Sequence, residues 1–410
     1  MKFQRMLTKR LVEALEVSPI VLLTGARQTG KTTLVKEIAE ARGMNYLSFD
    51  DLTYLAAAEK DPIGFLANLP KPLILDEVQR AAQLALPIKL DVDNRNQSGQ
   101  YILTGSANPL VAPKLNDSLA GRMMILNLWP LSQGELLGCK ETFLDNIFHE
   151  HWEASSPRGW SRDEMLKALA VGGYPRMQGL SASMRYEWCN SHLTTILERD
   201  VQDLAKISRL KELPNLMQLL SLRTANLFNV ADVGRAVGIP YTTLTVYLQL
   251  LEALFLIIRQ PAWHRNKKLT LTKMPKMYFA DTGLLCHLLR AEEGTLQANS
   301  VLLGPVLENF VVQEIRKQTT WSEQRVKLYH FRTQDGAEVD LVLENGVGDI
   351  VGIEVKSSQT ITAQDFRGLE VLAQETGEAF VRGLVLYPGN NIVPFGNNMF
   401  AVPISALWSA

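Results

Sequence analysis

Residues 25–33 limit what this chain can fold into more than any other part of the sequence. They read Gly-Ala-Arg-Gln-Thr-Gly-Lys-Thr-Thr and fit the pattern G-x-x-x-x-G-K-[ST] of a phosphate-binding loop. Residues 19–24 before the loop are apolar and rich in branched side chains, as in a buried parallel strand. Residues 34–40 after it carry apolar residues at helical spacing. This context favours a phosphate loop over a chance glycine-rich turn.

Each residue type in the loop has a chemical role. Gly25 and Gly30 let the backbone turn tightly and approach phosphate oxygens. The N–H groups of the loop and of the following helix form a cradle for negative charge. Lys31 is expected to reach the β- and γ-phosphates, and the Thr32 hydroxyl to ligate Mg²⁺. The sequence therefore predicts a site for ATP and Mg²⁺, lined by Gly25, Ala26, Arg27, Gln28, Thr29, Gly30, Lys31, Thr32 and Thr33.

A second stretch supplies the acidic half of such a site. Residues 71–75 read as an apolar strand that ends in Asp76 and Glu77. Asp76 is expected to hold Mg²⁺, usually through water, and Glu77 to orient and deprotonate the attacking water. The pair is a weak signal alone, because many buried strands end in an acid. It becomes a strong one where it follows a phosphate loop by one or two βα units.

The strand predicted at residues 101–103 ends in polar residues. Ser106 and Asn108 are the candidates to lie between the acidic pair and the γ-phosphate, and Thr104 is an alternative. A turn-capping role for all three is the competing interpretation. Arg122, before the strand predicted at 123–128, is a candidate to stabilise charge on a γ-phosphate, in its own subunit or from a neighbour. A surface arginine at a strand start is the other interpretation.

The alternation of strands and helices up to residue 135 predicts an α/β fold with a parallel sheet and helices on both faces. The nucleotide would then lie at the C-terminal ends of the strands. A chain of 410 residues is long enough for two to four domains. We predict an ATPase domain at 1–135, a helical linker or lid at 136–212, a winged-helix-like domain at 213–290 and a C-terminal α/β domain at 300–410.

Composition restricts the surroundings and the partners of the protein. The formal net charge is −1, so any nucleic-acid surface has to be a local basic patch. The three cysteines are far apart, have no metal-ligand spacing and favour a reducing cytoplasm. No apolar run approaches the ~20 residues of a membrane span, and the amphipathic start does not look like a signal peptide. We therefore expect a cytoplasmic protein with no membrane partner.

Residues 213–263 have the pattern of a helix-turn-helix with a wing. Helices are predicted at 213–224 and 229–237, a turn at 238–240 and a third helix from Tyr241, where a recognition helix would lie. Residues 254–260 and 277–280 are the candidate wing strands, and the basic and aromatic loop 263–268 lies between them. The third helix is nearly uncharged, so contact with nucleic acid and contact with protein both remain open.

The C-terminal part carries a second set of charged residues. Glu354 and Lys356 are two apart on a predicted strand and project to one face. Asp340 on the preceding strand and Glu308 on a helix are within reach of that face. The three carboxylates predict a site for Mg²⁺ or Mn²⁺, with Lys356 to position or deprotonate a bound water or to stabilise a charged state. Strand-end charges that pair with one another are the competing interpretation.

From end to end the chain resembles the bacterial and archaeal AAA-type ATPases that carry a C-terminal domain of once-unknown function. The resemblance implies a nucleoside-triphosphatase core, a winged-helix middle and a C-terminal domain similar to the PD-(D/E)XK nuclease fold. That fold includes members that have lost cleavage, so cleavage stays open. The stretches that carry the resemblance are 25–33, 75–80, 103–106, 119–122, 130–132, 172–175, 197–201, 278–283, 336–343 and 353–357.

Three functions fit these features. The first is ATP hydrolysis coupled to binding or remodelling of DNA, with a Mg²⁺-dependent nuclease-like domain. The second is a nucleotide-controlled switch with slow hydrolysis, no nuclease activity and a protein partner. The third is an ATPase whose C-terminal domain only grips nucleic acid. AAA-type ATPases commonly form rings, so the resemblance implies a homo-oligomer, and a hexamer if Arg122 acts in a neighbouring subunit.

Overall fold

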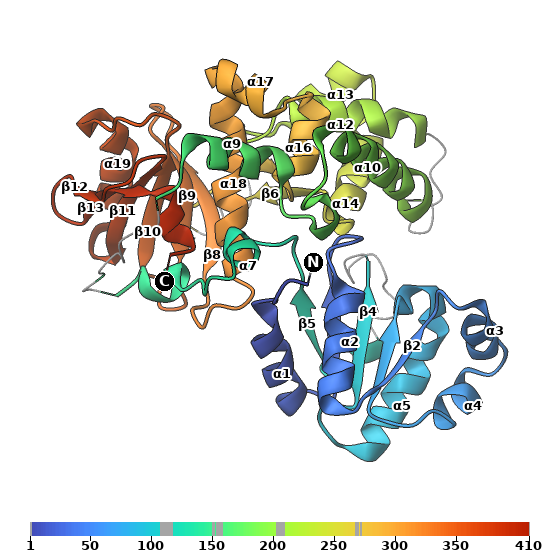
Figure 1. The fold of residues 1–410 in the computed structure, drawn as a ribbon. Coiled ribbons are helices and arrows are strands. Elements are labelled where there is room, and N and C mark those ends of the chain that lie inside the picture. Colours follow the sequence, from blue (N-terminus) through green and yellow to red (C-terminus); the bar gives the residue numbers. More distant parts are fainter. Residues whose placement is uncertain are drawn as a thin grey trace.

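Figure 1 shows the computed structural model of the chain, which describes residues 2–106, 118–149, 152, 159–201, 210–266, 270 and 273–409. A parallel sheet with flanking helices forms the N-terminal part, the middle part is mostly helical, and a mixed sheet forms the C-terminal part. In the view of Figure 1 the middle and C-terminal parts lie together above the N-terminal sheet. The fold class is α/β, as the sequence predicts.

The N-terminal sheet has five parallel strands in the order β2-β3-β4-β1-β5. The strands are β1 (Ile20–Thr24), β2 (Asn45–Ser48), β3 (Leu73–Asp76), β4 (Tyr101–Gly105) and β5 (Met123–Asn127). Both faces of the sheet are covered, by α1 (Leu7–Val17), α2 (Lys31–Arg42), α3 (Leu52–Lys60), α4 (Pro62–Ala67) and α5 (Ala85–Arg95).

The central strand β1 shows why this sequence forms a buried parallel sheet. All five of its residues are buried. Val21 and Leu23 belong to the apolar cluster that contains α1 and α2, while Ile20 and Leu22 belong to the cluster that contains α5. Because successive side chains of a strand point to opposite faces, a strand covered on both faces is apolar throughout.

The middle part contains three helices and a pair of strands near the ranges that the sequence predicts. They are α12 (Leu213–Ser221), α13 (Val230–Val237), α14 (Tyr241–Ala253) and the antiparallel strands β6 (Ile257–Gln260) and β7 (Lys276–Phe279). Asn229 caps α13 through its side-chain oxygen, and Gly238 ends it at φ 70°. The other elements are α7 (Gln133–Leu137), α8 (Phe143–Asn146), α9 (Arg162–Val171), α10 (Ala182–Thr195), the π-helical turn η4 (Ile196–Asp200), α16 (Thr282–Leu289) and α17 (Glu293–Ala298).

The C-terminal part packs two helices on a six-stranded sheet of order β12-β13-β11-β10-β9-β8. The pairs β8–β9 and β9–β10 are antiparallel, and β10–β11 and β11–β13 are parallel. The elements are α18 (Ser300–Gln318), β8 (Lys327–Arg332), β9 (Glu338–Glu344), β10 (Ile350–Val355), α19 (Arg367–Thr376), β11 (Phe380–Tyr387), β12 (Val393–Pro394) and β13 (Met399–Pro403).

The middle and C-terminal parts share one hydrophobic core. A single cluster of buried residues contains Ala26 of the phosphate loop and then runs from Phe143 in α8 to Trp408 near the C-terminus. It includes Leu251 of α14, Phe279 of β7, Phe310 of α18 and Leu384 of β11. Side chains from β7 can therefore take part in sites of the C-terminal sheet. The exact boundaries of the four predicted domains stay a prediction.

Among the helices of the described residues, none combines the length and the apolar character needed to cross a membrane. Cys139, Cys189 and Cys286 are all free thiols.

Candidate functional site

The phosphate loop connects the end of β1 to the start of α2, where the sequence predicts it. Gly25 has φ 150° and Gly30 has φ 100°, which are backbone conformations that favour glycine. A Cβ atom on Gly25 would lie 2.2 Å from the carbonyl oxygen of Leu128, just beyond β5. The close approach of a neighbouring chain segment, as well as the turn itself, therefore requires glycine at position 25.

The Lys31 side chain folds back into the loop. Its Nζ donates hydrogen bonds to the carbonyl oxygens of Gly25 at 2.8 Å and Ala26 at 3.0 Å. Burial lowers the pKa of Lys31. The Thr29 hydroxyl donates to the same Ala26 carbonyl at 3.0 Å, whereas Thr33 is exposed. The ammonium thus lies inside the turn that phosphate oxygens would enter.

Thr32 and Asp76 meet as a Mg²⁺ site requires. The Thr32 hydroxyl donates to Asp76 Oδ2 at 3.0 Å, and the Tyr46 hydroxyl donates to the same oxygen at 2.7 Å. The Thr104 hydroxyl donates to Asp76 Oδ1 and accepts from the backbone N–H of Glu77 at 3.0 Å. A hydroxyl and a carboxylate on adjacent elements are oxygen ligands of the kind that Mg²⁺ takes in nucleotide sites, so these residues fit the ion.

Glu77 lies beside Ser106, one of the residues predicted to lie between the acidic pair and the γ-phosphate. The Ser106 hydroxyl donates to Glu77 Oε2 at 3.2 Å and accepts from the Gln79 side-chain amide at 3.0 Å. That amide also donates to Glu77 Oε2. Glu77 itself has φ 57°, an uncommon backbone conformation for a residue with a side chain. The contacts fix the direction of the carboxylate at the end of β3.

Asn108 and Arg122 were predicted for the phosphate site but are not among the residues described there. Asn108 lies outside the described residues. Arg122 directly precedes β5, whose first residue, Met123, pairs with Ile20 at the start of β1. Since the strands are parallel, Arg122 lies at the edge of the sheet opposite to the phosphate loop. Its guanidinium pairs with Asp93 of α5, so the expectation that it reaches the γ-phosphate of its own chain is wrong.

Sequence reasoning missed Tyr46 and Gln79 as members of this site. A usable signal existed for each of them. Tyr46 lies on the strand that pairs with β3, two residues before its end, and Gln79 follows the acidic pair at the start of a helical turn. Thr104 was considered only as an alternative sensor, whereas its hydroxyl connects Asp76 to the backbone of Glu77.

Arg5 connects the phosphate loop to the segment after β5. Its guanidinium donates to the carbonyl oxygens of Thr29 and Trp129, both at 2.7 Å, and pairs with Glu135 of α7 at 3.0 Å. The side chain is 8% exposed. A charged group so well buried is stabilised here because each of its three nitrogens donates to an oxygen of the chain. The backbone of the loop is thus held from outside the loop.

Arg27 connects the same loop to the middle part of the chain. Its guanidinium pairs with Asp200 in η4 at 2.7 Å, and the two side chains are 32% and 10% exposed. Asp200 is buried in this contact, so residues 196–200 connect the middle part of the chain to the phosphate loop.

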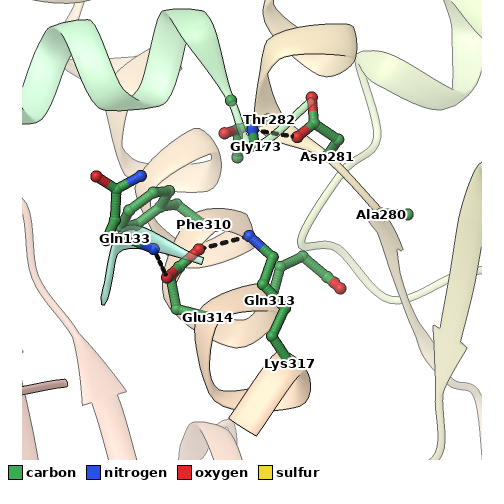
Figure 2. Close-up of a pocket in the computed structure, with 10 residues that line it drawn as sticks. Gln133, Gly173, Ala280, Asp281, Thr282, Phe310, Gln313, Glu314 and Lys317 are labelled. Atoms are coloured by element: carbon green, nitrogen blue, oxygen red, sulfur yellow. Dashed lines mark hydrogen bonds and ion pairs between the residues drawn. The ribbon is translucent and has the colours of Figure 1, made fainter. Parts of the chain in front are cut away.

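A cavity of about 10 Å³ lies where four segments of the chain meet (Figure 2). The backbone N–H of Gly173 donates to Asp281 at 2.6 Å, and the N–H of Gln133 donates to Glu314 of α18 at 2.7 Å. Lys317 donates to Glu314 as well, at 2.6 Å. This junction joins α7, the loop after α9, the residues at the start of α16, and α18.

In the C-terminal part the predicted residues come together with one that was not predicted. Lys276 of β7 places its ammonium 2.9 Å from Glu308 Oε1, 2.9 Å from Asp340 Oδ1 and 2.7 Å from Glu338 Oε1. Lys356 pairs with Glu354 at 2.9 Å. We call these six residues the carboxylate cluster.

The charges in the carboxylate cluster are strongly perturbed. Burial and the charge of Asp340 raise the pKa of both Glu308 and Glu354 to about 8. Burial favours a neutral Lys276, but the carboxylates around it, Asp340 foremost, hold its pKa well above the ordinary value. Among the described residues, no group of three His, Cys, Asp or Glu side chains is placed to hold a metal ion. The three carboxylates of the predicted metal site thus pair with lysines, Glu308 and Asp340 with Lys276 and Glu354 with Lys356.

Comparison with known proteins agrees with the architecture. Residues 17–137 match the family model of an AAA domain. These residues are similar to AAA domains. Residues 162–295 and 303–407 match the models of two domains of unknown function, DUF8612 and DUF4143. The matches support nucleotide binding by the N-terminal part and leave the other two parts without an assigned role.

Similar proteins and structures are known from several organisms. An uncharacterized protein of Mycobacterium tuberculosis is 28% identical over 401 residues, which cover 96% of this chain and 82% of that protein. A Walker-type ATPase of Pyrococcus abyssi aligns with a TM-score of 0.44 and 16% identity, over 69% of this chain and 94% of that one. The RuvB Holliday junction branch migration motor of Thermotoga maritima aligns with a TM-score of 0.30 and 19% identity, over 65% and 94%.

Proposed function

We propose that this protein hydrolyses ATP in the presence of Mg²⁺. The contact that carries the proposal is the hydrogen bond between Thr32 and Asp76, at the edge of the sheet where Lys31 and Glu77 also lie. These four residues meet from two strand ends, as phosphoryl transfer to water requires.

The roles of the side chains follow from their positions. Bound Mg²⁺ would neutralise developing charge on the phosphates, held by Thr32 and Asp76. The Lys31 ammonium would exchange the carbonyl oxygens of Gly25 and Ala26 for phosphate oxygens. Glu77 would take a proton from the attacking water, with its carboxylate directed by Ser106 and Gln79.

The proposal is tested by measuring phosphate release from Mg-ATP with the purified protein and two variants. Lys31→Ala is expected to abolish both nucleotide binding and turnover. Lys60→Ala, which removes an exposed lysine at the end of α3, is the matched control and is expected to behave like the wild type. Full turnover in Lys31→Ala would overturn the assignment.

We further propose that the nucleotide controls contacts between the phosphate loop and the rest of the chain, as in a molecular switch. Arg27 pairs with Asp200 in the middle part, and Arg5 binds the Thr29 carbonyl. A phosphate group that enters the loop competes for Arg27 and shifts the backbone that Arg5 holds. A ligand shifts such an equilibrium only by its different affinity for the two states.

Hydrogen exchange in residues 182–201, with and without ATP, tests the switch. In the wild type ATP is expected to change the protection of this segment, and in Asp200→Asn the change is expected to be smaller. Glu187→Gln, on the exposed side of α10, is the control. An ATP effect of equal size in Asp200→Asn would contradict this route of coupling.

DNA is a candidate partner of this protein. The reason is that the order of α12, α13, α14, β6 and β7 is that of a winged helix. The face of α14 argues for protein instead, since its exposed residues include Tyr241 and Val246 and its only charged residue is Glu252. ATP turnover measured with single-stranded, duplex and four-way-junction DNA separates the two. Strong stimulation by one DNA form supports remodelling of DNA, and turnover indifferent to all of them supports a protein partner.

A homo-oligomer remains part of the proposal. An arginine supplied by a neighbouring subunit, with Arg122 as the candidate, would require assembly, and a hexamer is the expected size. Sedimentation of the protein with and without ATP measures the number of subunits directly.

A further inference from the structure

We propose that the carboxylate cluster is a metal-free site in which the ammonium of Lys276 occupies the place of a divalent cation. Three carboxylate oxygens, one each from Glu308, Glu338 and Asp340, lie within 2.7–2.9 Å of the Lys276 Nζ atom. An ammonium has three N–H donors, so these three acceptors satisfy it completely. They come from a helix and a strand that converge on a strand-borne lysine.

Asp340 and Glu308 accept further hydrogen bonds from the chain. Asp340 Oδ2 accepts the backbone N–H of Val355 at 3.0 Å. Glu308 Oε1 also accepts the hydroxyl of Tyr278 at 2.7 Å. A divalent cation at 2.0–2.6 Å from the same oxygens would have to displace these donors as well as the lysine. Both oxygens of Asp340 and Oε1 of Glu308 are thus already bound by hydrogen-bond donors of the chain.

Lys276 is held too firmly to move aside. Its side chain is 1% exposed, and its backbone pairs with Gln260 in the β6–β7 hairpin. Separating a buried ammonium from its carboxylates without replacing it is strongly destabilising, because it leaves uncompensated charges in the interior. By contrast, the side chain of Lys356 is 32% exposed. It pairs with Glu354 at 2.9 Å and with Asp365 at 3.9 Å. Lys356 is the lysine to which the sequence analysis assigned a catalytic role.

This arrangement gives the cluster a different task from metal-dependent cleavage. Lys276 belongs to the wing hairpin, whereas Glu308, Glu338 and Asp340 belong to α18 and β9. The ammonium therefore ties the wing to the C-terminal sheet. Cleavage of DNA by a metal at these carboxylates is not expected, even where DNA binds the protein.

Binding of Mn²⁺ to the full-length protein without nucleotide tests the proposal, with free Mn²⁺ measured by electron paramagnetic resonance. The wild type and Asp340→Asn are expected to bind the same number of ions, since Asp340 takes no metal. Lys276→Met is expected to bind one ion more per chain, and Lys276→Met with Asp340→Asn to lose it again. Lys356→Met, the matched lysine control, is expected to bind no more than the wild type. Any ion at Thr32 and Asp76 is common to all variants and cancels.

Two results would overturn the proposal. One is an ion bound by the wild type and lost in Asp340→Asn, because the lysine would then yield its place to a metal. The other is a folded Lys276→Met that gains no ion. If Lys276→Met does not fold, Lys276→Met with Glu338→Gln replaces it, since this pair removes one positive and one negative charge and keeps Glu308, Asp340 and Glu354. In either case the number of Mn²⁺ ions bound by the wild type is compared with the number bound by Asp340→Asn. Equal numbers support the proposal, and a loss in Asp340→Asn overturns it.

Discussion

The two charged sites of this protein are assembled in different ways. The phosphate site takes all its members from residues 25–106, at the C-terminal ends of neighbouring strands of one sheet. The carboxylate cluster takes Lys276 from the wing hairpin and its carboxylates from α18, β9 and β10. A local motif defines the first site, whereas contact between two parts of the chain defines the second. Signals along the sequence therefore identify the first far better than the second.

The largest expected effect concerns the phosphate site. Glu77→Gln keeps the shape of the side chain but removes the base, so turnover of Mg-ATP should fall by about 10²–10⁴-fold while ATP still binds. Phosphate release and binding of a fluorescent ATP analogue measure the two properties. Glu59→Gln, on the exposed side of α3, is the control. A Glu77→Gln variant with wild-type turnover would show that this site is not built as its motif suggests.

The next effect separates the two lysines of the carboxylate cluster. Lys276→Met leaves three carboxylates around an apolar side chain and should lower the free energy of unfolding by about 3–5 kcal/mol. Lys356→Met removes a partly exposed partner and should cost about 1 kcal/mol or less. Urea unfolding of both variants measures the difference. Equal costs would mean that Lys276 is not the centre of the cluster.

The third prediction concerns pH and Glu141, which lies between α7 and α8. Burial and the charge of Glu314 raise the pKa of Glu141 to about 8, from an ordinary value of 4.5. Between these values the folded protein keeps a proton that the unfolded chain has lost, so stability falls as pH rises, by up to about 1.4 kcal/mol per unit. Glu141→Gln stays neutral and should flatten this decline, which unfolding at pH 5, 6.5 and 8 measures. An unchanged slope would place the titrating group elsewhere.

The smallest effect is expected for Arg122→Ala. Its guanidinium pairs with Asp93 at the edge of the sheet opposite to the phosphate loop. Turnover at low protein concentration should therefore stay close to that of the wild type. A deficit that appears only as the protein concentration rises would instead indicate that Arg122 completes the site of a neighbouring subunit. A series of protein concentrations distinguishes these outcomes.

Much of the fold follows from patterns within single elements. Short stretches of sequence are enough to predict the buried strand β1, the phosphate loop and the acidic end of β3. Each of these features depends mainly on residues next to it in the chain. The helices and hairpin strands of the winged-helix region appear close to where periodicity predicts them, since Asn229 and Gly238 mark the ends of α13. For the C-terminal part, the competing interpretation of charges that pair with each other is the one that the structure supports.

The sequence by itself determined the parallel sheet, the phosphate loop and the carboxylates that face one another, because strand and helix periodicity decide which side chains share a face. Only the tertiary structure decided which partners the buried arginine and lysine side chains bind. Arg5 and Arg27 bind partners more than a hundred residues away, and Lys276 enters a cluster on another sheet. A buried charge takes whichever opposite charge packing brings within about 3 Å, and no local pattern records that distance.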